Sequence, residues 1–227
     1  MSSPETYDDR QAADYAAFAA DSFSWKYIER PVFEEQLTAI VPARARLLDI
    51  GCGTGRVLRY LLDQGAVPDQ LCGIDPSPSM LAHAQAVEPR SHLARATAEA
   101  LPFDDNSFDF ITGNMWLHNI NTKQARAAIR EIGRTLVPAG RFVSVDLNPR
   151  QYGSVSNWRQ QVTPWGGKML VFAHNYSKLQ EEAEQVGLTT SAFYEPIIAP
   201  AGQVESREYT RYAQFPRRIA WVLKKSL

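Results

Sequence analysis

The stretch LLDIGCGTGR, residues 47–56, decides the fold of this chain. It opens as an apolar run that contains one acid, Asp49. Three glycines then follow at every second position, Gly51, Gly53 and Gly55. Glycine lets the backbone turn tightly and lets a ligand approach with no Cβ in the way. We therefore predict a strand that ends in a ligand-binding turn, with a helix directly after it, as at the carboxyl edge of open α/β sheets.

Outward from this stretch, short apolar runs alternate with helical patterns. The predicted strands span residues 46–51, 70–75, 91–96, 108–114 and 140–146. The predicted helices between them span residues 55–65, 77–87 and 121–136. Alternation of this kind is typical of parallel strands with helices on both faces of the sheet.

The C-terminal part has a different order of elements. Residues 177–187 predict a helix with Ser177 as N-cap, Gln180 completing a capping box and Gly187 as the stop. Two strand-like runs, 188–197 and 218–225, follow with no helix pattern between them, so they should pair antiparallel. The predicted fold is a Rossmann-like, mostly parallel sheet of seven strands with an antiparallel C-terminal hairpin and helices on both faces.

We expect one domain over residues 1–227, because no repeat or composition shift marks a boundary. Its parts are an aromatic-rich helical cap and a core, then an insertion or lid, then a C-terminal helix with a strand pair. These parts span residues 1–45, 46–149, 150–176 and 177–227. Long excursions beside a sheet often serve as lids or binding loops.

Composition excludes several functions. The 24 basic and 25 acidic residues give a net charge of −1, so the chain has no field to gather nucleic acid or anionic lipid. The apolar runs are far too short for a membrane span, and the start of the chain lacks the pattern of a signal peptide. Cys52 and Cys72 are not spaced as a metal or redox pair. We expect a cytoplasmic protein with neither a disulfide nor a metal; its oligomeric state is open.

A second acid supports a nucleoside ligand. Asp75 ends the next predicted strand twenty residues after Gly55, where a carboxylate accepts hydrogen bonds from the hydroxyls of a ribose. The alternative is that Asp75 caps the following helix, a task that Ser77 could also perform.

The glycine spacing argues against a dinucleotide. An NAD-dependent dehydrogenase would carry G-x-G-x-x-G and bind a pyrophosphate at the helix N-terminus, whereas this chain has G-x-G-x-G. Asp49 would repel phosphate and attract an ammonium group. The ligand that fits carries ribose and an amine without phosphate, and S-adenosylmethionine meets that description.

Over residues 46–141 the chain resembles the class I S-adenosylmethionine-dependent methyltransferases. Four stretches carry the resemblance in the family's order: LLDIGCGTG, GIDPSPSML, ATAEALPFDDNSFDFITGNMWLHNI and REIGRTLVPAGRFV. The resemblance implies a methyl transfer to a small acceptor, with S-adenosylmethionine as the methyl donor. It assigns the methionine part to Asp49, Gly51, Cys52, Gly53 and Gly55, the ribose to Asp75, the adenine to Pro76, Met80, Thr97, Ala98 and Glu99, the methyl side to Asn114 and Met115, and a cover to Tyr15.

Two positions depart from the family pattern. Thr97 stands where many relatives have Asp, so a hydroxyl replaces the carboxylate that would accept from the adenine amino group. The turn VPAG, residues 137–140, replaces a pair of glycines, and we expect Gly140 alone to need a special backbone angle.

His118, just past the fourth strand, is the candidate general base, although a pocket-lining role is open for it. His174 is a weaker candidate. Aromatic residues should form an apolar chamber for a small, aromatic acceptor: Trp25, Tyr27, Trp116, Tyr152 and Trp158. The acceptor atom, O, N or C, is open. Two alternatives are a carrier-bound or macromolecular acceptor, and a protein that binds S-adenosylmethionine without transferring its methyl group.

Overall fold

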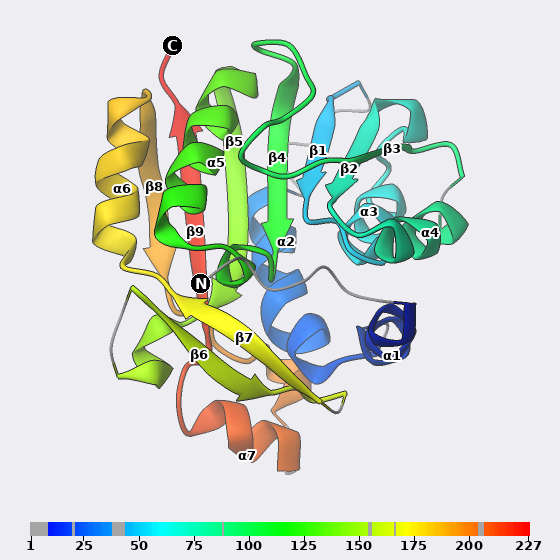
Figure 1. The fold of residues 1–227 in the computed structure, drawn as a ribbon, viewed down its shortest axis with the longest axis vertical. Coiled ribbons are helices and arrows are strands. Elements are labelled where there is room, and N and C mark those ends of the chain that lie inside the picture. The colour runs from blue at the N-terminus through cyan, green and yellow to red at the C-terminus, as the bar shows by residue number, and fades with distance from the viewer. Residues whose placement is uncertain are drawn as a thin grey trace.

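The computed structural model describes residues 9–19, 21–37, 44–87, 89–153, 156–165, 167–203 and 207–227. Its main sheet has seven strands in the order β3-β2-β1-β4-β5-β9-β8 (Figure 1). Their bounds are β1 Leu47–Ile50, β2 Leu71–Asp75, β3 His92–Arg95, β4 Phe108–Asn114, β5 Leu136–Leu147, β8 Leu188–Tyr194 and β9 Arg218–Lys225. β1 to β5 pair in parallel, and β9 runs antiparallel between β5 and β8. The predicted fold class is confirmed.

Helices cover both faces of this sheet. On one face α5 (Thr122–Thr135) and α6 (Tyr176–Gln185) pack on a cluster that includes Ile111, Phe142 and Trp221. On the other face α2 (Arg30–Leu37), α3 (Arg56–Asp63) and α4 (Pro78–Val87) pack on Leu47 and Val143. Side chains alternate between the faces along a strand, so Phe142 and Val143 reach opposite clusters.

The described part of the N-terminal cap is helical, as expected. α1 (Asp9–Ala19) is followed by a π-helical turn, η1 (Trp25–Glu29), which continues into α2. Residues 1–8, 20 and 38–43 of the predicted cap lie outside the described residues. In the described part of the chain, no helix is both long and apolar enough to cross a membrane.

The insertion contains a hairpin that the sequence analysis did not predict. After the short helix η4 (Pro149–Tyr152), β6 (Asn157–Val162) and β7 (Lys168–Ala173) form a separate two-stranded antiparallel sheet. Figure 1 shows this hairpin beyond the carboxyl ends of the parallel strands, next to α7 (Arg207–Ala213). The hairpin and α7 therefore stand where a ligand of the sheet would bind.

Two local predictions for the C-terminal part are wrong. α6 begins one residue before Ser177, and its N-cap is Asn175, whose side chain accepts from the amide of Lys178 at 3.4 Å. β8 and β9 pair antiparallel as predicted, but η5 (Pro200–Gly202) and α7 lie between them. α7 escaped detection because its seven residues bury only Tyr212, which leaves no helical periodicity to read.

The VPAG turn, residues 137–140 within the bounds of β5, also differs from the prediction. Ala139, not Gly140, has the left-handed angle, with φ of 63°. Gly140 is needed for space, since a Cβ there would lie 2.8 Å from the carbonyl oxygen of Val137 and 3.1 Å from that of Asp109. The turn thus places an L-residue in a left-handed conformation that only glycine adopts without a steric penalty.

Ala139→Gly should therefore stabilise the protein. The left-handed conformation costs an L-residue about 1–2 kcal/mol, and the greater unfolded-state entropy of glycine removes about 0.5–1 kcal/mol of that gain. We expect the free energy of unfolding in urea to rise by about 0.5–1 kcal/mol. Gly140→Ala is the matched control and should destabilise. A lower midpoint for Ala139→Gly would contradict this account of the turn.

Candidate active site

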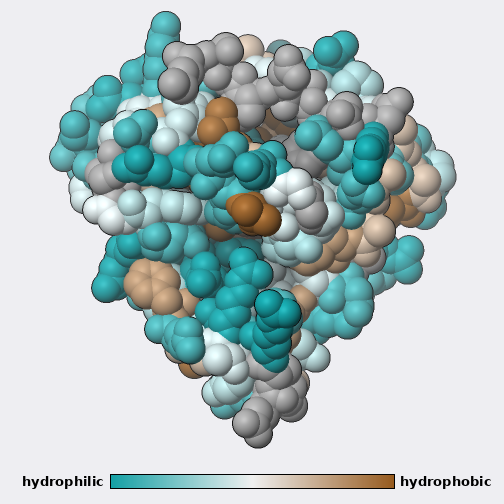
Figure 2. Space-filling view, turned by 60° about the horizontal axis from the view of Figure 1, so that its bottom comes forward, coloured by the Kyte–Doolittle hydropathy of each residue, from teal (hydrophilic) through white to brown (hydrophobic). Residues whose placement is uncertain are grey.

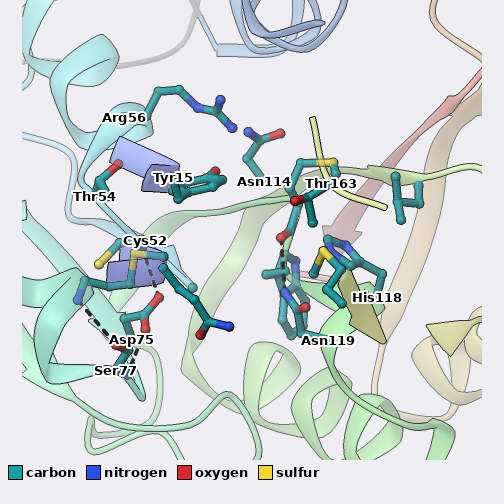
Figure 3. Close-up of a pocket in the computed structure, with 18 of the residues that line it drawn as sticks. Tyr15, Cys52, Thr54, Arg56, Asp75, Ser77, Asn114, His118, Asn119 and Thr163 are labelled. Carbon is teal, nitrogen blue, oxygen red and sulfur yellow. Dashed lines mark hydrogen bonds between the residues drawn. The ribbon is translucent and has the colours of Figure 1, made fainter. Parts of the chain in front are cut away.

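A cavity of about 940 Å³ lies at the carboxyl ends of β1, β2 and β4 (Figure 3). α1 and the β6–β7 hairpin close it on the side away from the sheet. Most of the residues predicted to bind the ligand line it: Tyr15, Asp49, Gly51, Cys52, Gly53, Asp75, Pro76, Met80, Thr97, Ala98, Glu99, Asn114, Met115, Trp116 and His118. The fold thus gathers these positions around one space.

Asp75 holds the glycine loop in place. Its Oδ2 accepts from the amide of Gly53 at 3.0 Å and its Oδ1 from the amide of Ser77 at 2.9 Å. Burial raises the pKa of Asp75, and these two amides offset the effect only in part. Each carboxylate oxygen still has a free lone pair, so Asp75 can accept further hydrogen bonds from hydroxyls in the cavity.

Gly55 does not line the cavity, which corrects the predicted role in binding. It is the N-cap of α3, with φ of 83°, and it faces α4. A Cβ there would lie 3.1 Å from the Cα of Ala84. The third glycine of the motif therefore serves the close packing of two helices.

Asp49 is a buried carboxylate that lines the cavity. Its Oδ1 accepts from the hydroxyl of Thr112 at 2.8 Å. Burial raises the pKa of Asp49 to about 7, and the hydrogen bond from Thr112 lowers it too little to compensate. A cation that entered beside it would favour the ionised form and would gain the attraction of a desolvated charge.

Glu29 forms the centre of a buried ion cluster in the cavity wall. Arg218 of β9 donates from Nε at 2.7 Å, Arg56 of α3 from Nη2 at 3.4 Å, and Asn114 of β4 from Nδ2 at 3.0 Å. Burial alone would raise the pKa of Glu29, but the two guanidinium groups outweigh it and lower that pKa. The cluster fixes the N-terminal cap to three elements of the core.

Asn114 leaves one acceptor for a ligand. Its Nδ2 is used by Glu29, while its Oδ1 is buried and has no hydrogen-bond partner among the described residues. Leaving such an atom unpaired costs about 1–3 kcal/mol, so a donor is expected at this point. Asp49 and Asn114 both line the cavity, and together they offer two acceptors for an ammonium group.

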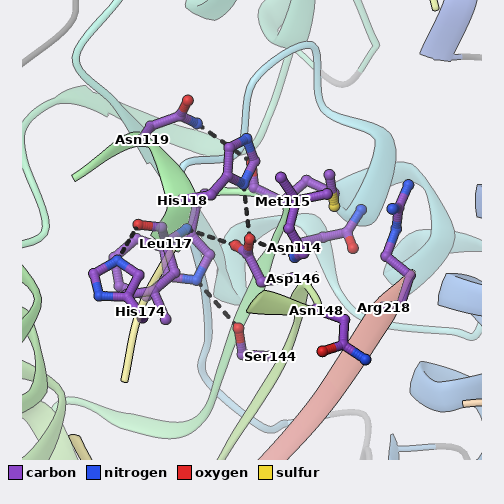
Figure 4. Close-up of polar contacts among 12 residues, drawn as sticks. Asn114, Met115, Leu117, His118, Asn119, Ser144, Asp146, Asn148, His174 and Arg218 are labelled. Atoms are coloured by element: carbon purple, nitrogen blue, oxygen red, sulfur yellow. Dashed lines mark hydrogen bonds and ion pairs between the residues drawn. The ribbon is translucent and has the colours of Figure 1, made fainter. Parts of the chain in front are cut away.

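His118 and Asp146 form a buried pair (Figure 4). The His118 Nδ1 lies 2.7 Å from Asp146 Oδ1, and the amides of Leu117 and Leu147 donate to the same carboxylate at 2.7 and 2.6 Å. Burial would raise the pKa of Asp146, but His118 and the two amides lower it on balance. An ionised Asp146 keeps a proton on Nδ1, which leaves Nε2 as the nitrogen available to a ligand.

Two predicted acceptor-binding residues of the cap lie away from the cavity. Trp25 packs on Phe33 and Tyr60, with the Arg56 guanidinium 4.8 Å from its ring centre. Tyr27 packs against Gly202, where a Cβ would lie 2.4 Å from its ring. Neither lines the cavity, so both are packing residues. Their distant partners, Tyr60 and Gly202, lie too far along the chain for sequence periodicity to reveal them.

Two further predictions need correction. Trp158 packs edge-on against Phe172 across the hairpin and lies outside the cavity wall. His174 is buried behind the wall, its Nε2 2.9 Å from the Leu117 carbonyl oxygen, and burial lowers its pKa, so it supports η3 (Leu117–Asn119). Tyr152 lines a smaller cavity next to the main one. Trp116 lines the main cavity, yet its ring is largely in the core and donates to Ser144 at 3.3 Å.

Several lining residues were missed by the sequence analysis. Trp165 lies edge-on to Tyr15 and tilted against Phe18, with ring centres 5.1 and 5.2 Å apart, and this aromatic group covers the cavity over the glycine loop. Glu29 and Arg218 were also missed, because they are 189 residues apart and only the fold brings them together. An acid at the end of a helical cap gives no local signal of burial.

Comparisons with known proteins agree with this geometry. Residues 48–144 match a family model described as a methyltransferase domain. A putative S-adenosylmethionine-dependent methyltransferase from Listeria monocytogenes has the same fold, with a TM-score of 0.70, 16% identity, and coverage of 88% of this chain and 99% of that chain. The chain thus shares the fold of S-adenosylmethionine-dependent methyltransferases, and its residues 48–144 match the model of a methyltransferase domain.

Curated relatives match only part of this chain. A demethylmenaquinone methyltransferase of Lactiplantibacillus plantarum is 36% identical over 61% of this chain and 62% of its own length. A malonyl-[acyl-carrier protein] O-methyltransferase of Enterobacter lignolyticus is 35% identical over 47% of this chain and 41% of its own. The chain thus spans less than two thirds of either relative. The family model ends at residue 144, before the hairpin and α7 that complete the cavity.

Asp49 should make the protein less stable as pH rises. Its folded pKa of about 7 lies above the ordinary value of 3.8, so the unfolded chain ionises first and stability falls between these pH values. Asp49→Asn removes this effect. In urea unfolding, the free energy of unfolding of the wild type should fall relative to that of Asp49→Asn by about 2–3 kcal/mol between pH 5 and pH 8.

Asp69→Asn, at an exposed carboxylate, controls for the loss of one negative charge. If the difference in free energy of unfolding between the wild type and Asp49→Asn stays constant between pH 5 and pH 8, Asp49 is ionised throughout this range in the folded protein.

Proposed function

We propose that this methyltransferase binds S-adenosylmethionine in the main cavity and transfers its methyl group to a small molecule. One observation supports this most strongly. The wall holds two buried acids, Asp49 and Asp75, and the Oδ1 of Asn114, which has no hydrogen-bond partner among the described residues. All three lie beside the loop of glycines whose φ angles are positive. This set of acceptors suits hydroxyl and ammonium donors and would repel phosphate.

The residues fit the parts of that molecule. Asp75 would accept from the ribose hydroxyls, and the segment from Thr97 to Glu99 would lie along the adenine, with Pro76 and Met80 on its other sides. Asp49 and the free Oδ1 of Asn114 would bind the α-ammonium group. When bound, S-adenosylmethionine supplies an activated methyl group on its sulfonium.

The remaining tasks fall to this chain's own residues. Tyr15, Phe18 and Trp165 close the cavity and exclude water. Well-aligned reactants gain about 7–11 kcal/mol over encounter in solution, so positioning can supply much of the rate. His118, held by Asp146, is placed to take a proton from the acceptor through Nε2 as general base.

Binding and transfer can be tested together. S-adenosylhomocysteine should bind in calorimetry, and Asp75→Ala should weaken it by about tenfold or more, because hydrogen bonds to a charged acceptor are lost. Asp69→Ala is the control at an exposed acid. Methyl-labelled S-adenosylmethionine with a bacterial metabolite extract should give a labelled product by mass spectrometry. No binding would refute the proposal, and binding without any labelled product would favour a non-catalytic role.

His118→Gln should lower kcat by about 10²–10⁴ and leave S-adenosylhomocysteine affinity unchanged, since a base acts on the acceptor. Asp146→Asn should also lower kcat, because the amide no longer selects the Nδ1-protonated ring. His92→Gln, at an exposed histidine of β3, serves as control. The readout is the labelled product rate over pH 6–9. A loss smaller than tenfold would make His118 part of the pocket lining only.

A further inference from the structure

Building on the proposed function, we propose that the acceptor is an anion. In this proposal a carboxylate or phosphoryl group of the acceptor binds Arg211 and Arg217, and the nucleophilic atom faces His118. Both arginines line the main cavity, which His118 lines as well.

The first argument is the distribution of charge around the cavity wall. Every acidic lining residue comes from the first hundred residues: Asp14, Glu29, Asp49, Asp75 and Glu99. Among its described residues, the wall contributed by residues 147–218 includes no Asp or Glu and four cations, Lys168, Arg211, Arg217 and Arg218. The five acids outnumber the two cations on their own side of the wall, Arg10 and Arg56. The cavity therefore has an acidic end at the glycine loop and a basic end at the hairpin and α7.

The second argument is that two of these cations lack a counter-ion. Arg218 is neutralised by Glu29 at 2.7 Å. No carboxylate of the described residues lies within ion-pair distance of Arg211 or Arg217. Asp146 does not serve them, because its oxygens already accept from His118 and two backbone amides. Two half-buried guanidinium groups with no carboxylate partner among the described residues favour an anion from outside the chain.

Arg217 is also held in a fixed position. Its Nε donates to the carbonyl oxygen of Arg211 at 3.2 Å and its Nη1 to Gln151 Oε1 at 3.4 Å. These contacts involve only neutral acceptors, so the full positive charge is retained. Nη2 stays available to an oxyanion, and the guanidinium fork suits two-point binding of a carboxylate or phosphate.

The space continues beyond the arginines. A second cavity of about 410 Å³ shares Gln151, Gln161, Arg211 and Arg217 with the main one. Its other lining residues are Arg150, Tyr152 and Phe215, and Arg150 is paired with Glu195 at 2.8 Å. Arg211 and Arg217 thus stand where the two cavities meet, with aromatic rings nearby for the organic part of the acceptor.

The outer surface agrees with a polar acceptor. Figure 2 brings forward the side of the molecule that carries the hairpin and α7, and hydrophilic residues dominate the coloured surface there. A lipid-like acceptor or a membrane would favour a broad apolar patch instead.

The test fractionates the acceptor pool by charge before the assay. A bacterial metabolite extract is passed over an anion-exchange resin, and the unretained and salt-eluted fractions are each incubated with wild-type protein and methyl-labelled S-adenosylmethionine. We expect the labelled product only from the eluted fraction. Phosphatase treatment of that fraction should abolish the product if the group is phosphoryl and spare it if it is a carboxylate.

Matched variants connect the result to the arginines. Arg217→Gln and Arg211→Gln should each raise KM for the active fraction by about tenfold or more, with kcat within about threefold and S-adenosylhomocysteine affinity unchanged. Arg207→Gln, an exposed arginine one turn earlier on α7 and outside the cavity wall, should change none of these.

The other possible results would contradict either the anionic acceptor or the methyl transfer itself. Product from the unretained fraction, or variants with unchanged KM, would overturn the anionic acceptor and leave the methyltransferase function intact. Product from neither fraction, with S-adenosylhomocysteine bound, would overturn both the transfer and its anionic acceptor.

Discussion

The parallel pairing of β2, β1, β4 and β5 is the constraint on which the site depends. Asp49 lies opposite Gly73 on one side and Thr112 on the other, and Asn114 pairs with Val145. Because these strands point the same way, their last residues meet at one edge of the sheet. That edge collects Asp49, Asp75, Asn114 and Asp146, although they are spread over nearly one hundred positions. No single motif could assemble this group without the sheet.

Gathering acids at one buried edge has an electrostatic cost, which the structure offsets unevenly. Burial raises the pKa of both Asp49 and Asp75, so these carboxylates are destabilised in the free protein. Arg56 and Arg218 lie nearby, yet both pair with Glu29 of the cap. Removing one partner from such a buried pair typically costs about 3–5 kcal/mol, so the cluster ties the cap firmly to the sheet. Among the described residues, Asp49 and Asp75 have no such cation partner, so burial of their charge lowers the stability of the free protein and leaves them available to a ligand.

The sequence was sufficient for features that depend on neighbours along the chain. The mostly parallel sheet with helices on both faces followed from the alternating patterns, and the placement of Asp49 and Asp75 beside the glycine loop followed from their distance to the glycines. It was insufficient where a distant residue decides. Trp25 and Tyr27 have the composition of a binding chamber, but Tyr60 and Gly202 hold them in the core. Steric detail was equally hidden: Ala139 takes the left-handed angle, while Gly140 is needed because a Cβ there would crowd two carbonyl oxygens.

The two ends of the cavity differ in how they are built, and this explains why the acceptor end escaped the sequence analysis. The acidic end stands on strands whose pairing fixes it, whereas the basic end comes from a hairpin and a short helix attached outside the sheet. Such attachments can change their side chains without disturbing strand pairing. Under the proposed function, the acids repel an anionic acceptor from the glycine loop and the arginines repel a sulfonium from the far end. The opposed charges would then orient the two reactants relative to each other within one cavity, whose wall also includes His118.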